Sequence, residues 1–561
     1  MVGIVGQLLL LVALGACALA GVAYVVAARS EEDADARLLG RVGWSVSVGA
    51  ALAAAGLLAY LFLAHQFQYA YVYQNSSKDL PAYFLFSSFW AGQEGSFLLW
   101  IVLNGAVGAG LIRWAGRRWE APVMAVVAGC QFFLLTMIAG VHIGGLQIGA
   151  SPFLPLAEKF PDAPIFQANP DFIPADGTGL NELLQNYWMV IHPPTLFAGF
   201  ASMIAPFAFA VAALWKKRYT QWVRPALPFM LFGCLVLGVG IAMGGYWAYE
   251  TLSFGGYWAW DPVENSSLVP WIVGIAALHA MLIQKKSGRA HKAALGLSIA
   301  SYLLVVYSTF LTRSGVLGDI SVHSFVDLGL HNQLLLWMGA MIVVGFGMMA
   351  WRYRDLPAPK RESNVLSREF LIFSGAMLLC AMAAVIILGT SAPIFGRIFR
   401  DSPSGVPTEF YNKWTLPLSV GLAFLAGMGQ LFWWNKMSVE RVSRVLMKPL
   451  GLAVASTVGV LLFTPFLERT VRVSAAPQQA PMAEAGLLGA GSFSQFWAVY
   501  GQSLLLMLLV FAAFFALYGN GIVMWRVGRG NPRMAGGALT HVGFALVVLG
   551  IVASSGFNNT L

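Results

Sequence analysis

Histidine is the side chain in this sequence best suited to binding a transition metal, and two of its eight histidines lie inside long apolar runs. His279 lies six residues before Lys285, and His541 lies eight residues after Arg533. In helices that rise about 1.5 Å per residue, these spacings place the two imidazoles about 9 Å and about 12 Å from the same side of a membrane. An imidazole in hydrocarbon is stable only when its nitrogens have partners.

The matched depths of His279 and His541 leave two interpretations open. Each ring could simply hydrogen-bond a carbonyl of a neighbouring helix, as an isolated membrane histidine does. Alternatively, the pair could ligate a haem b, whose flat apolar macrocycle fits between helices while two neutral imidazoles bind the iron. The second interpretation predicts a split low-spin α-band in the reduced protein, which replacement of either histidine by alanine removes.

A tryptophan-rich segment, residues 246–271, reads YWAYETLSFGGYWAWDPVENSSLVPW. The aromatic residues expected at the membrane rim are Trp247, Tyr249, Phe254, Tyr257, Trp258 and Trp260. An ordinary aromatic belt would explain scattered rings of this kind. A flat, polarisable ligand held against ring faces explains their density better.

The same segment contains residues that break or begin helices. Gly255-Gly256 permits close backbone approach, Asp261-Pro262 predicts a turn, and Asn265-Ser266 is expected to cap the helix that follows. Belts do not require a glycine pair or a D-P-V-E-N sequence that looks buried. The segment is therefore predicted to be a shaped binding loop.

Two further histidines lie on either side of this loop in the sequence. His192 lies in NYWMVIHPPTLF, where Pro193-Pro194 is expected to stop the helix from extending back and to hold the imidazole at the rim. His323 lies in RSGVLGDISVHSF. Each alone could be an interfacial histidine, but together with the tryptophans they could supply both axial ligands of a second haem. The remaining histidines, which lack such surroundings, are His65, His142, His291 and His331.

The elements that must position these residues are membrane helices. Of the 561 residues, 58% are hydrophobic and 11% are charged, which excludes a water-soluble fold. About fourteen apolar runs are long enough to cross a bilayer. We therefore expect an all-α, polytopic bundle of about 13 to 15 transmembrane helices that forms a single integral membrane domain over residues 1–561.

The net charge of +9 reflects membrane topology. When the runs are threaded alternately across the membrane, 26 of the 34 Lys and Arg residues fall on one side, which the positive-inside rule makes cytoplasmic. This distribution argues against a nucleic-acid partner. The long loops, including 143–194 and 468–499, then face the extracytoplasmic side, where chemistry carried by loops is expected.

Several functional classes are excluded or weakened. The short cytoplasmic segments contain no phosphate-binding G-x-x-x-x-G-K-[ST] motif, so no nucleotide hydrolysis is expected. The four cysteines lie singly in apolar runs, so the chain performs no dithiol chemistry of its own. The apolar runs carry no acidic or basic residue well away from their ends, and the sequence has no internal repeat. Both facts weaken a pump or a secondary transporter.

The residues above match a known pattern. FGGYWAWDPVENSSLVPW resembles the tryptophan-rich WWD signature of the haem-handling protein superfamily. Four other segments are similar to one member family, CcmF, the haem lyase component of the cytochrome c maturation system, and they occur in that family's order between about residues 66 and 557. They are AYFLFSSFWAGQEGSFLLW, NYWMVIHPPTLFAGF, FLTRSGVLGDISVHSF and LTHVGFALVVLGIVASSGF.

The resemblance implies roles for particular residues. His192 and His323 would be the external haem ligands, and His279 and His541 would hold a permanent transmembrane haem b. The WWD loop, 247–271, would bind the substrate haem. Its expected contacts are Trp247, Gly255, Gly256, Tyr257, Trp258, Trp260, Asp261, Glu264 and Asn265. Of these, Trp258, Trp260 and Asp261 would join the external histidines in catalysis.

The implied activity is that of a holocytochrome c synthase in the bacterial inner membrane, with its active face in the periplasm. It would take haem from a membrane-anchored haem chaperone and join the vinyl groups to the thiols of a C-x-x-C-H motif in apocytochrome c. Thiol-reducing components and quinol are further expected partners besides membrane lipid. Arg313, one of few outer basic residues, is a predicted contact of a haem propionate.

The sequence departs from the family pattern in three places, which affect aromatic stacking and partner docking but not the expected haem ligands. Gln93 stands where a histidine is expected, Phe254 and Tyr257 occupy positions that are often Trp, and the 468–499 loop is short. An alternative function is a haem exporter or handover protein that makes no covalent bond. Relatives with that task resemble the chain only around the tryptophan loop and are much shorter, so length and the internal histidine pair favour the lyase.

Overall fold

The structure is a computed structural model that describes residues 2–30, 33–251, 256–318, 321, 325, 328–358, 364–399, 405–468, 470 and 493–557. Thirteen of the helices described are long and apolar enough to cross a membrane. This number agrees with the 13 to 15 predicted from the sequence, and the all-α polytopic fold is confirmed. One further apolar run forms helix α17 (Thr408–Gly429), which is not among those thirteen spans.

Backbone contacts divide the chain into two units. Unit 1 comprises Met1–Ala358 and Thr390–Gly405, and unit 2 comprises Pro359–Gly389 and Val406–Leu561. The boundary falls within helix α16 (Arg368–Phe399).

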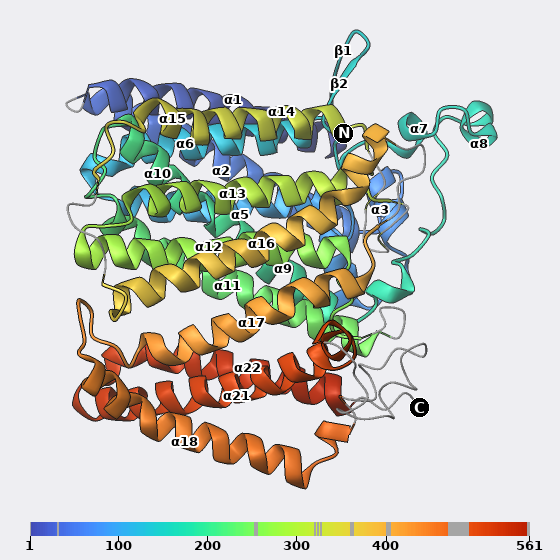
Figure 1. Ribbon diagram of the computed structural model, residues 1–561. Coiled ribbons are helices and arrows are strands. Elements are labelled where there is room, and N and C mark those ends of the chain that lie inside the picture. Colours follow the sequence, from blue (N-terminus) through green and yellow to red (C-terminus); the bar gives the residue numbers. More distant parts are fainter. Residues whose placement is uncertain are drawn as a thin grey trace. The chain divides into compact units, whose positions relative to one another are not determined.

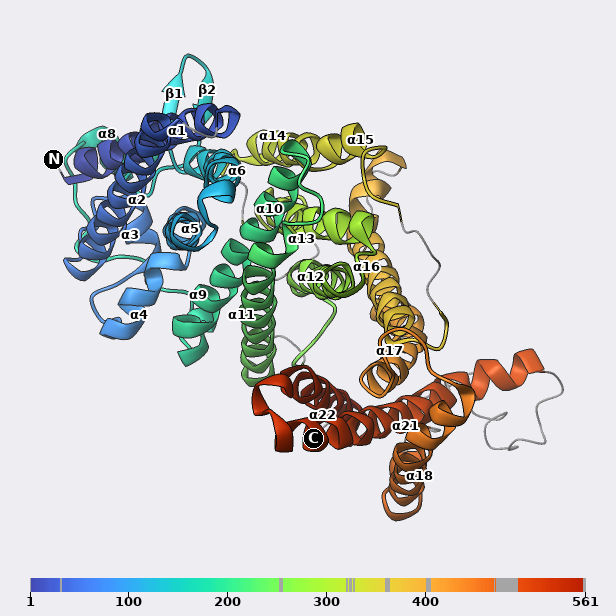
Figure 2. The ribbon, with the colours of Figure 1, turned by 90° about the vertical axis from the view of Figure 1, so that its left-hand side faces the viewer.

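Unit 1 is a bundle of long helices that lie side by side, seen lengthwise in Figure 1 and from one end in Figure 2. Its helices are α1 (Val2–Arg29), α2 (Ala34–Leu63), α3 (Ala70–Asn75), α4 (Ala82–Ser87), α5 (Gln93–Trp114), α6 (Arg117–Met137), α7 (Leu156–Lys159), α8 (Pro164–Ala168), α9 (Tyr187–Ser202), α10 (Ile204–Trp215), α11 (Val223–Glu250), α12 (Pro262–Ser287), α13 (His291–Arg313), α14 (His331–Ile342) and α15 (Met348–Arg352). A π-helical turn, Val343–Gly347, joins α14 to α15, and 3₁₀ turns cover Ser88–Trp90 and Glu182–Leu184. A short antiparallel hairpin of β1 (Val141–Ile143) and β2 (Leu146–Ile148) projects beyond the helices (Figure 1).

Small residues let the first two helices of unit 1 approach closely. A Cβ added to Gly43 on α2 would lie 3.0 Å from the Ala16 carbonyl oxygen of α1. Ser47, one turn further along α2, donates to the Ala13 carbonyl at 2.8 Å. Close packing and hydrogen bonds between helices replace the hydrophobic effect as the source of association inside a membrane.

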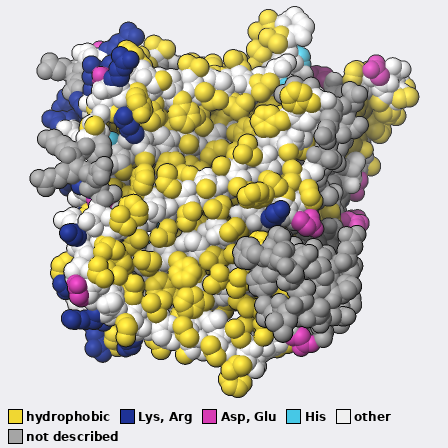
Figure 3. All heavy atoms as spheres, viewed as in Figure 1, with side chains coloured by type: hydrophobic (Ala, Val, Ile, Leu, Met, Phe, Trp, Pro, Cys, Tyr) yellow, Lys and Arg dark blue, Asp and Glu magenta, His cyan; other side chains and the backbone are white. Residues whose placement is uncertain are grey.

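The two ends of the unit 1 helices differ in charge. Lys216 follows α10, and Lys285 and Lys286 lie in the last turn of α12. In Figure 3, Lys and Arg side chains of unit 1 gather at one end of the helices, with a broad apolar surface between the ends. The site described below lies at the opposite end, where α9 and α12 begin and α11 and α13 end.

Unit 2 contains α17, α18 (Val439–Phe463), α21 (Phe493–Gly530) and α22 (Gly536–Phe557), with a 3₁₀ turn at Pro532–Met534. Helix α21 is central, because α17, α18 and α22 all pack against it. Gly427 of α17 makes this packing close, since an added Cβ would lie 2.7 Å from the Phe515 ring. Most of the 468–499 loop predicted from the sequence lies outside the described residues.

Candidate functional site

His192 lies within helix α9, not in front of it. Asn186 caps this helix by accepting the backbone N–H of Trp188 at 2.9 Å, and the helix then continues through Pro193 and Pro194. The expectation that the two prolines stop the helix is therefore wrong. Pro193 has no N–H for the Met189 carbonyl one turn earlier, but the indole N–H of Trp90 donates to that carbonyl at 2.9 Å instead.

The His192 ring is oriented by helix α11. Its Nδ1 lies 2.8 Å from the Gly240 carbonyl oxygen. A carbonyl only accepts, so Nδ1 carries the proton in the neutral ring and Nε2 carries the lone pair. Histidines that bind metals commonly have this arrangement, in which a carbonyl holds one nitrogen and the other is the ligand.

Helix α11 is shaped around this imidazole. A Cβ added to Gly244 would lie 2.7 Å from His192 Cε1 and 3.2 Å from Nε2, so any larger residue would push the ring away. One turn later, the Trp247 ring lies 5.8 Å from the His192 ring, centroid to centroid, in an edge-to-face arrangement. The Trp247 indole nitrogen is buried and has no hydrogen-bond partner. The imidazole of His192 and the unsatisfied indole N–H of Trp247 therefore lie side by side.

Sequence reasoning did not single out Trp188 or Glu250 in this region. The Trp188 indole donates to Glu250 Oε2 at 2.9 Å, and its ring lies 5.1 Å from that of Tyr246. Trp188 lies four residues before His192, which places both on one helix face. That i, i+4 relationship could have identified it, had the prolines not predicted that the helix begins later.

The tryptophan loop enters helix α12 through an unusual backbone. Gly256 has φ +136° and Trp260 has φ +55°, a left-handed conformation that is rare for a tryptophan. The Trp258 and Trp260 rings lie 6.0 Å apart and are nearly perpendicular. Gly255 lies outside the described residues, as does Phe254.

The polar residues after these tryptophans hold the loop in place. Asp261 is the N-cap of α12, accepting the Val263 N–H at 2.8 Å, and Glu264 Oε2 accepts the N–H groups of Asp261 and Ala259 at 3.1 and 2.9 Å. This is a capping box with Asp261 in the role that Asn265-Ser266 was predicted to fill. The prediction failed because Pro262 occupies the first helical position, which starts the helix earlier.

Asn265 is completely buried inside this first turn. Its amide nitrogen donates to the Trp260 carbonyl at 2.9 Å and to Thr390 Oγ1 at 3.0 Å. The first of these bonds fixes the carbonyl of the residue with the left-handed backbone. The Asn265 side chain thus stabilises the backbone of the loop and does not contact its aromatic rings through this bond.

The segment after helix α13 reaches the same loop. Ser321 Oγ donates to Asp261 Oδ1 at 2.9 Å. His323, the second predicted external ligand, lies outside the described residues. Among the described residues of this segment, Ser321 is thus tied directly to the helix cap below Trp258 and Trp260.

Arg313 is buried at the end of α13, with 5% of its surface exposed. Its guanidinium carbon lies 4.7 Å from the ring centroids of both Phe97 and Phe325, and 5.6 Å from that of Phe197. Cation–π contacts of this kind stabilise a desolvated cation. Its Nη1 is buried without a hydrogen-bond partner. The aromatic rings around the guanidinium therefore leave this N–H donor unsatisfied. The sequence predicted that Arg313 contacts a haem propionate, which the structure does not test, and the side chain is buried among aromatic rings.

Gln93, at the position where the resemblance led us to expect a histidine, is the first residue of α5. The loop before this helix is organised by Tyr71, whose hydroxyl accepts the Gly92 N–H at 2.9 Å and donates to the Phe89 carbonyl at 3.0 Å. Burial raises the pKa of Tyr71 well above that of a free tyrosine, so the hydroxyl stays protonated and keeps both bonds. Gln93 itself is buried, with 3% of its surface exposed.

The two membrane histidines share one local geometry. His279 Nδ1 lies 2.8 Å from the Ile275 carbonyl oxygen on α12, and His541 Nδ1 lies 2.7 Å from the Gly537 carbonyl oxygen on α22. Each ring therefore donates from Nδ1 to the carbonyl four residues earlier and carries its lone pair on Nε2. His279 belongs to unit 1 and His541 to unit 2.

In the described part of the chain, no three His, Cys, Asp or Glu side chains gather into a site for a metal ion. The other histidines are dispersed. His65 follows α2 with φ 49°, His142 lies on the projecting hairpin, His291 begins α13 and His331 begins α14. An imidazole that stands alone and has its Nδ1 held by a carbonyl, as at His192, His279 and His541, fits a haem iron. The porphyrin supplies the other ligands, so the protein needs to provide only axial ones.

Comparison with known proteins shows which family the chain belongs to. A family model described as "Cytochrome C assembly protein" matches residues 90–317, which contain His192 and the tryptophan loop. The CcmF protein of Pseudomonas aeruginosa, a "Cytochrome c-type biogenesis protein", is 31% identical over 513 residues, which cover 90% of this chain and 70% of that protein. The chain belongs to the CcmF family.

Two other comparisons bear on this membership. The ccl1 protein of Rhodobacter capsulatus, named a cytochrome c-type biogenesis protein, is 32% identical over 74% of this chain, but the chain spans only 62% of its length. A solved structure named "Cytochrome c Heme Lyase CcmF" matches with a TM-score of 0.71 at 24% identity, covering 99% of this chain and 77% of that one. The CcmF fold therefore extends over nearly the whole chain. Its apolar helices and bacterial relatives support a multi-pass inner membrane protein.

Proposed function

We propose that this protein is a haem lyase of cytochrome c maturation. Its substrates are haem, received from a membrane-anchored haem chaperone, and an apocytochrome c that carries a C-x-x-C-H motif. It joins the two by thioether bonds on the periplasmic face of the membrane, in a complex with thiol-reducing components of the same system. Membership of the CcmF family supports this class of activity.

The observation that carries the proposal is the setting of His192. The Gly240 carbonyl holds Nδ1, the glycine at 244 leaves room beside Cε1 and Nε2, and the Trp247 ring stands next to the imidazole. These residues fit one axial position of a haem whose face rests on aromatic rings. We assign His323 as the second axial ligand. The bond from Ser321 to Asp261 supports this assignment, because it ties the segment of His323 to the tryptophan loop.

The protein's own residues bind and orient the substrates. His192 and His323 clamp the iron, Trp258 and Trp260 form the platform for the macrocycle, and Arg313 receives a propionate on its unsatisfied Nη1. The substrate haem supplies two vinyl groups, and each substrate thiol adds its S–H across one vinyl C=C, forming a C–S and a C–H bond. Orientation is then the main contribution of the chain, since it decides which vinyl meets which sulfur.

A second haem, a resident haem b, would be held by His279 and His541. The donor sets fit this role, because each Nδ1 is fixed by a carbonyl and each Nε2 carries the lone pair. When bound, such a haem supplies one-electron transfer, which would keep the substrate iron reduced, with quinol as the electron donor. The two histidines would set its position and its low-spin state.

Complementation in a bacterial host that lacks its own CcmF tests the lyase proposal. Cells expressing this chain with the rest of the maturation system should accumulate a reporter cytochrome c that retains haem on a denaturing gel. His192→Ala should lower the yield at least tenfold, since it removes one axial ligand. His142→Ala, on the projecting hairpin, is the matched control and should behave as wild type.

The same experiment separates the lyase from a haem exporter. An exporter would leave the reporter without covalent haem even when haem reaches the periplasm, which a haem-binding periplasmic chaperone can report. Covalent reporter formed equally well without this chain would refute the lyase activity. Equal yields for His192→Ala and the control would refute the assignment of His192.

A further inference from the structure

Unit 2 contains a pocket that the haem chemistry does not use. Its volume is about 440 Å³, within the range of about 300–1,000 Å³ typical of small-molecule sites. The residues that line it are Arg368, Phe432, Trp433, Trp434, Asn435 and Lys436. The lining therefore carries two cations, an indole pair and an amide, and among these described residues it has no carboxylate.

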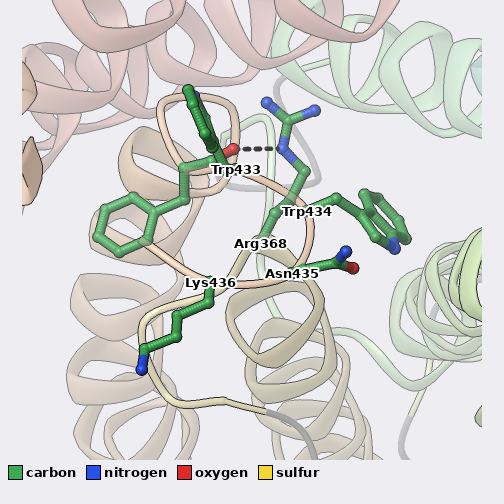
Figure 4. A pocket seen from close by; sticks show the side chains of 6 residues that line it. Arg368, Trp433, Trp434, Asn435 and Lys436 are labelled. Atoms are coloured by element: carbon green, nitrogen blue, oxygen red, sulfur yellow. Dashed lines mark hydrogen bonds between the residues drawn. The ribbon is translucent and has the colours of Figure 1, made fainter. Parts of the chain in front are cut away.

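Arg368 is held in position by the loop that follows α17. Its Nε donates to the Phe432 carbonyl at 3.0 Å and its Nη2 to the Gln430 carbonyl at 2.6 Å, the first of which is drawn in Figure 4. Its backbone N–H also donates to the Trp433 carbonyl at 2.7 Å. A guanidinium has five N–H donors, so these two side-chain bonds leave three further N–H groups for other acceptors.

The tryptophans of the loop supply an N–H donor and contact a third cation, Arg441. The Trp434 indole nitrogen is buried and has no hydrogen-bond partner. A buried N–H without a partner is destabilising, and an acceptor in the pocket would remove that cost. On the other side, the Arg441 guanidinium lies 3.7 Å from the Trp433 ring centroid. Figure 4 shows Arg368, at the start of α16, and Lys436, in the loop, extending in different directions. Positive charge therefore lies on both sides of the loop.

The pocket lies where membrane spans end. Arg368 is the first residue of the span Arg368–Arg397, and the loop leads directly into the span Val439–Phe463. Tryptophans and basic residues at this depth meet lipid headgroups. Basic pockets between transmembrane helices on the cytoplasmic side are typical binding sites of anionic phospholipids.

We propose that this pocket binds the phosphate of an anionic phospholipid headgroup. The phosphate oxygens accept from the guanidinium of Arg368 and from the indole N–H of Trp434, while Lys436 and Arg441 favour a headgroup with net negative charge. The headgroup thereby joins the start of α16 to the loop between α17 and α18. The site is independent of the proposed haem chemistry, since none of its residues is assigned to it.

Titration of the purified full-length protein in detergent with short-chain lipids tests the proposal. Dihexanoyl phosphatidylglycerol should bind at one site, at least tenfold more tightly than dihexanoyl phosphatidylcholine, and more weakly as salt rises. Trp434→Phe keeps the ring but removes the N–H and should lower the affinity by about tenfold. Trp525→Phe is the matched control, because Trp525 also lies beside an arginine, Arg529, but outside the pocket.

Competition with inorganic phosphate distinguishes a site for a phospholipid headgroup from a site for free phosphate. We expect it to compete only weakly, because it lacks the glycerol and acyl groups that the membrane interface would hold. Inorganic phosphate that binds as tightly as phosphatidylglycerol would overturn the lipid assignment. Equal affinity for the two lipids, or equal affinity of Trp434→Phe and the control, would overturn the site itself.

Discussion

The imidazole of His192 and the indole of Trp247 meet edge to face, with their centroids 5.8 Å apart and their planes inclined at 66°. The two residues come from different helices, α9 and α11, and Gly244 lies one turn before Trp247 on the second of them. The absence of a side chain at 244 is what allows α11 to pass beside the ring. The position of the His192 imidazole therefore depends on one glycine.

Gly244→Ala should disable the outer site without unfolding the protein. The new Cβ would lie 2.7 Å from His192 Cε1, which is closer than non-bonded carbon atoms approach, so the ring must move. Alanine is favoured over glycine in a helix by up to about 1 kcal/mol, so the thermal midpoint should not fall much. We expect at least a tenfold loss of covalent cytochrome in the complementation assay.

The control for this substitution is Gly339→Ala, on α14, where an added Cβ has no neighbour within 4 Å. It should retain wild-type yield. If Gly244→Ala also retained it, the ring of His192 would not need its observed position, and its role as an axial ligand would be untenable.

Substitutions of Asp261 test whether this residue acts as a helix cap or through its negative charge. As the N-cap of α12 and the acceptor from Ser321, it needs only an oxygen acceptor, which asparagine also provides. Asp261→Asn should therefore preserve lyase yield, and Asp261→Ala should destabilise the loop by about 1 kcal/mol and reduce the yield. Covalent haem on the reporter and the thermal midpoint should be measured together. A loss in the asparagine variant as large as in alanine would indicate that the negative charge itself takes part in the reaction.

Local signals in the sequence predicted the membrane class and the number of spans, because hydropathy is read directly from the chain. The path of α9 could not be predicted in this way. Pro193 inside a helix leaves the Met189 carbonyl without its partner, and the replacement donor, Trp90, lies 99 residues away. Only the tertiary fold shows that this cost is met.

Arg313 illustrates the same limit for burial. Its place at the outer end of an apolar run did not indicate that the side chain is buried, since arginine is rarely buried without compensation. The compensation comes from Phe97 and Phe325, which belong to different segments of the chain. Likewise, the tautomer of His192 depends on the Gly240 carbonyl of another helix. Contacts of this kind have no periodic pattern in the sequence.

The outer loops should lose local structure in acid. Asp176 accepts the N–H groups of Lys78 and Gly177 at 2.8 and 2.7 Å, and these bonds, chiefly that from Lys78, lower its pKa below 3.8. A carboxyl with a lowered pKa in the folded state contributes stability above its unfolded pKa and loses it as the pH falls through the folded value. We expect the Lys78 amide to lose protection from hydrogen exchange below about pH 4.

Two variants test this assignment. Asp176→Ala should remove the protection of Lys78 at all pH values, after correction for intrinsic exchange rates. Asp171→Ala, on the same outer loop, should keep both the protection and its pH dependence. Protection of Lys78 that is independent of pH in the unaltered protein would contradict the role of the Asp176 carboxylate.

The proposed internal haem requires two histidines as ligands, so loss of either one should have the same effect. His279 and His541 each donate Nδ1–H to the carbonyl four residues earlier, so each presents Nε2 in the same way. If both bind one iron, then either His279→Ala or His541→Ala should abolish the low-spin α-band of the reduced, purified protein, because one axial ligand does not sustain a bis-histidine haem. His291→Ala, at the start of α13, should leave the band intact. A band unchanged in both variants would mean that each imidazole only satisfies its own helix, and a band lost in one variant alone would assign the iron to a single histidine and a different partner.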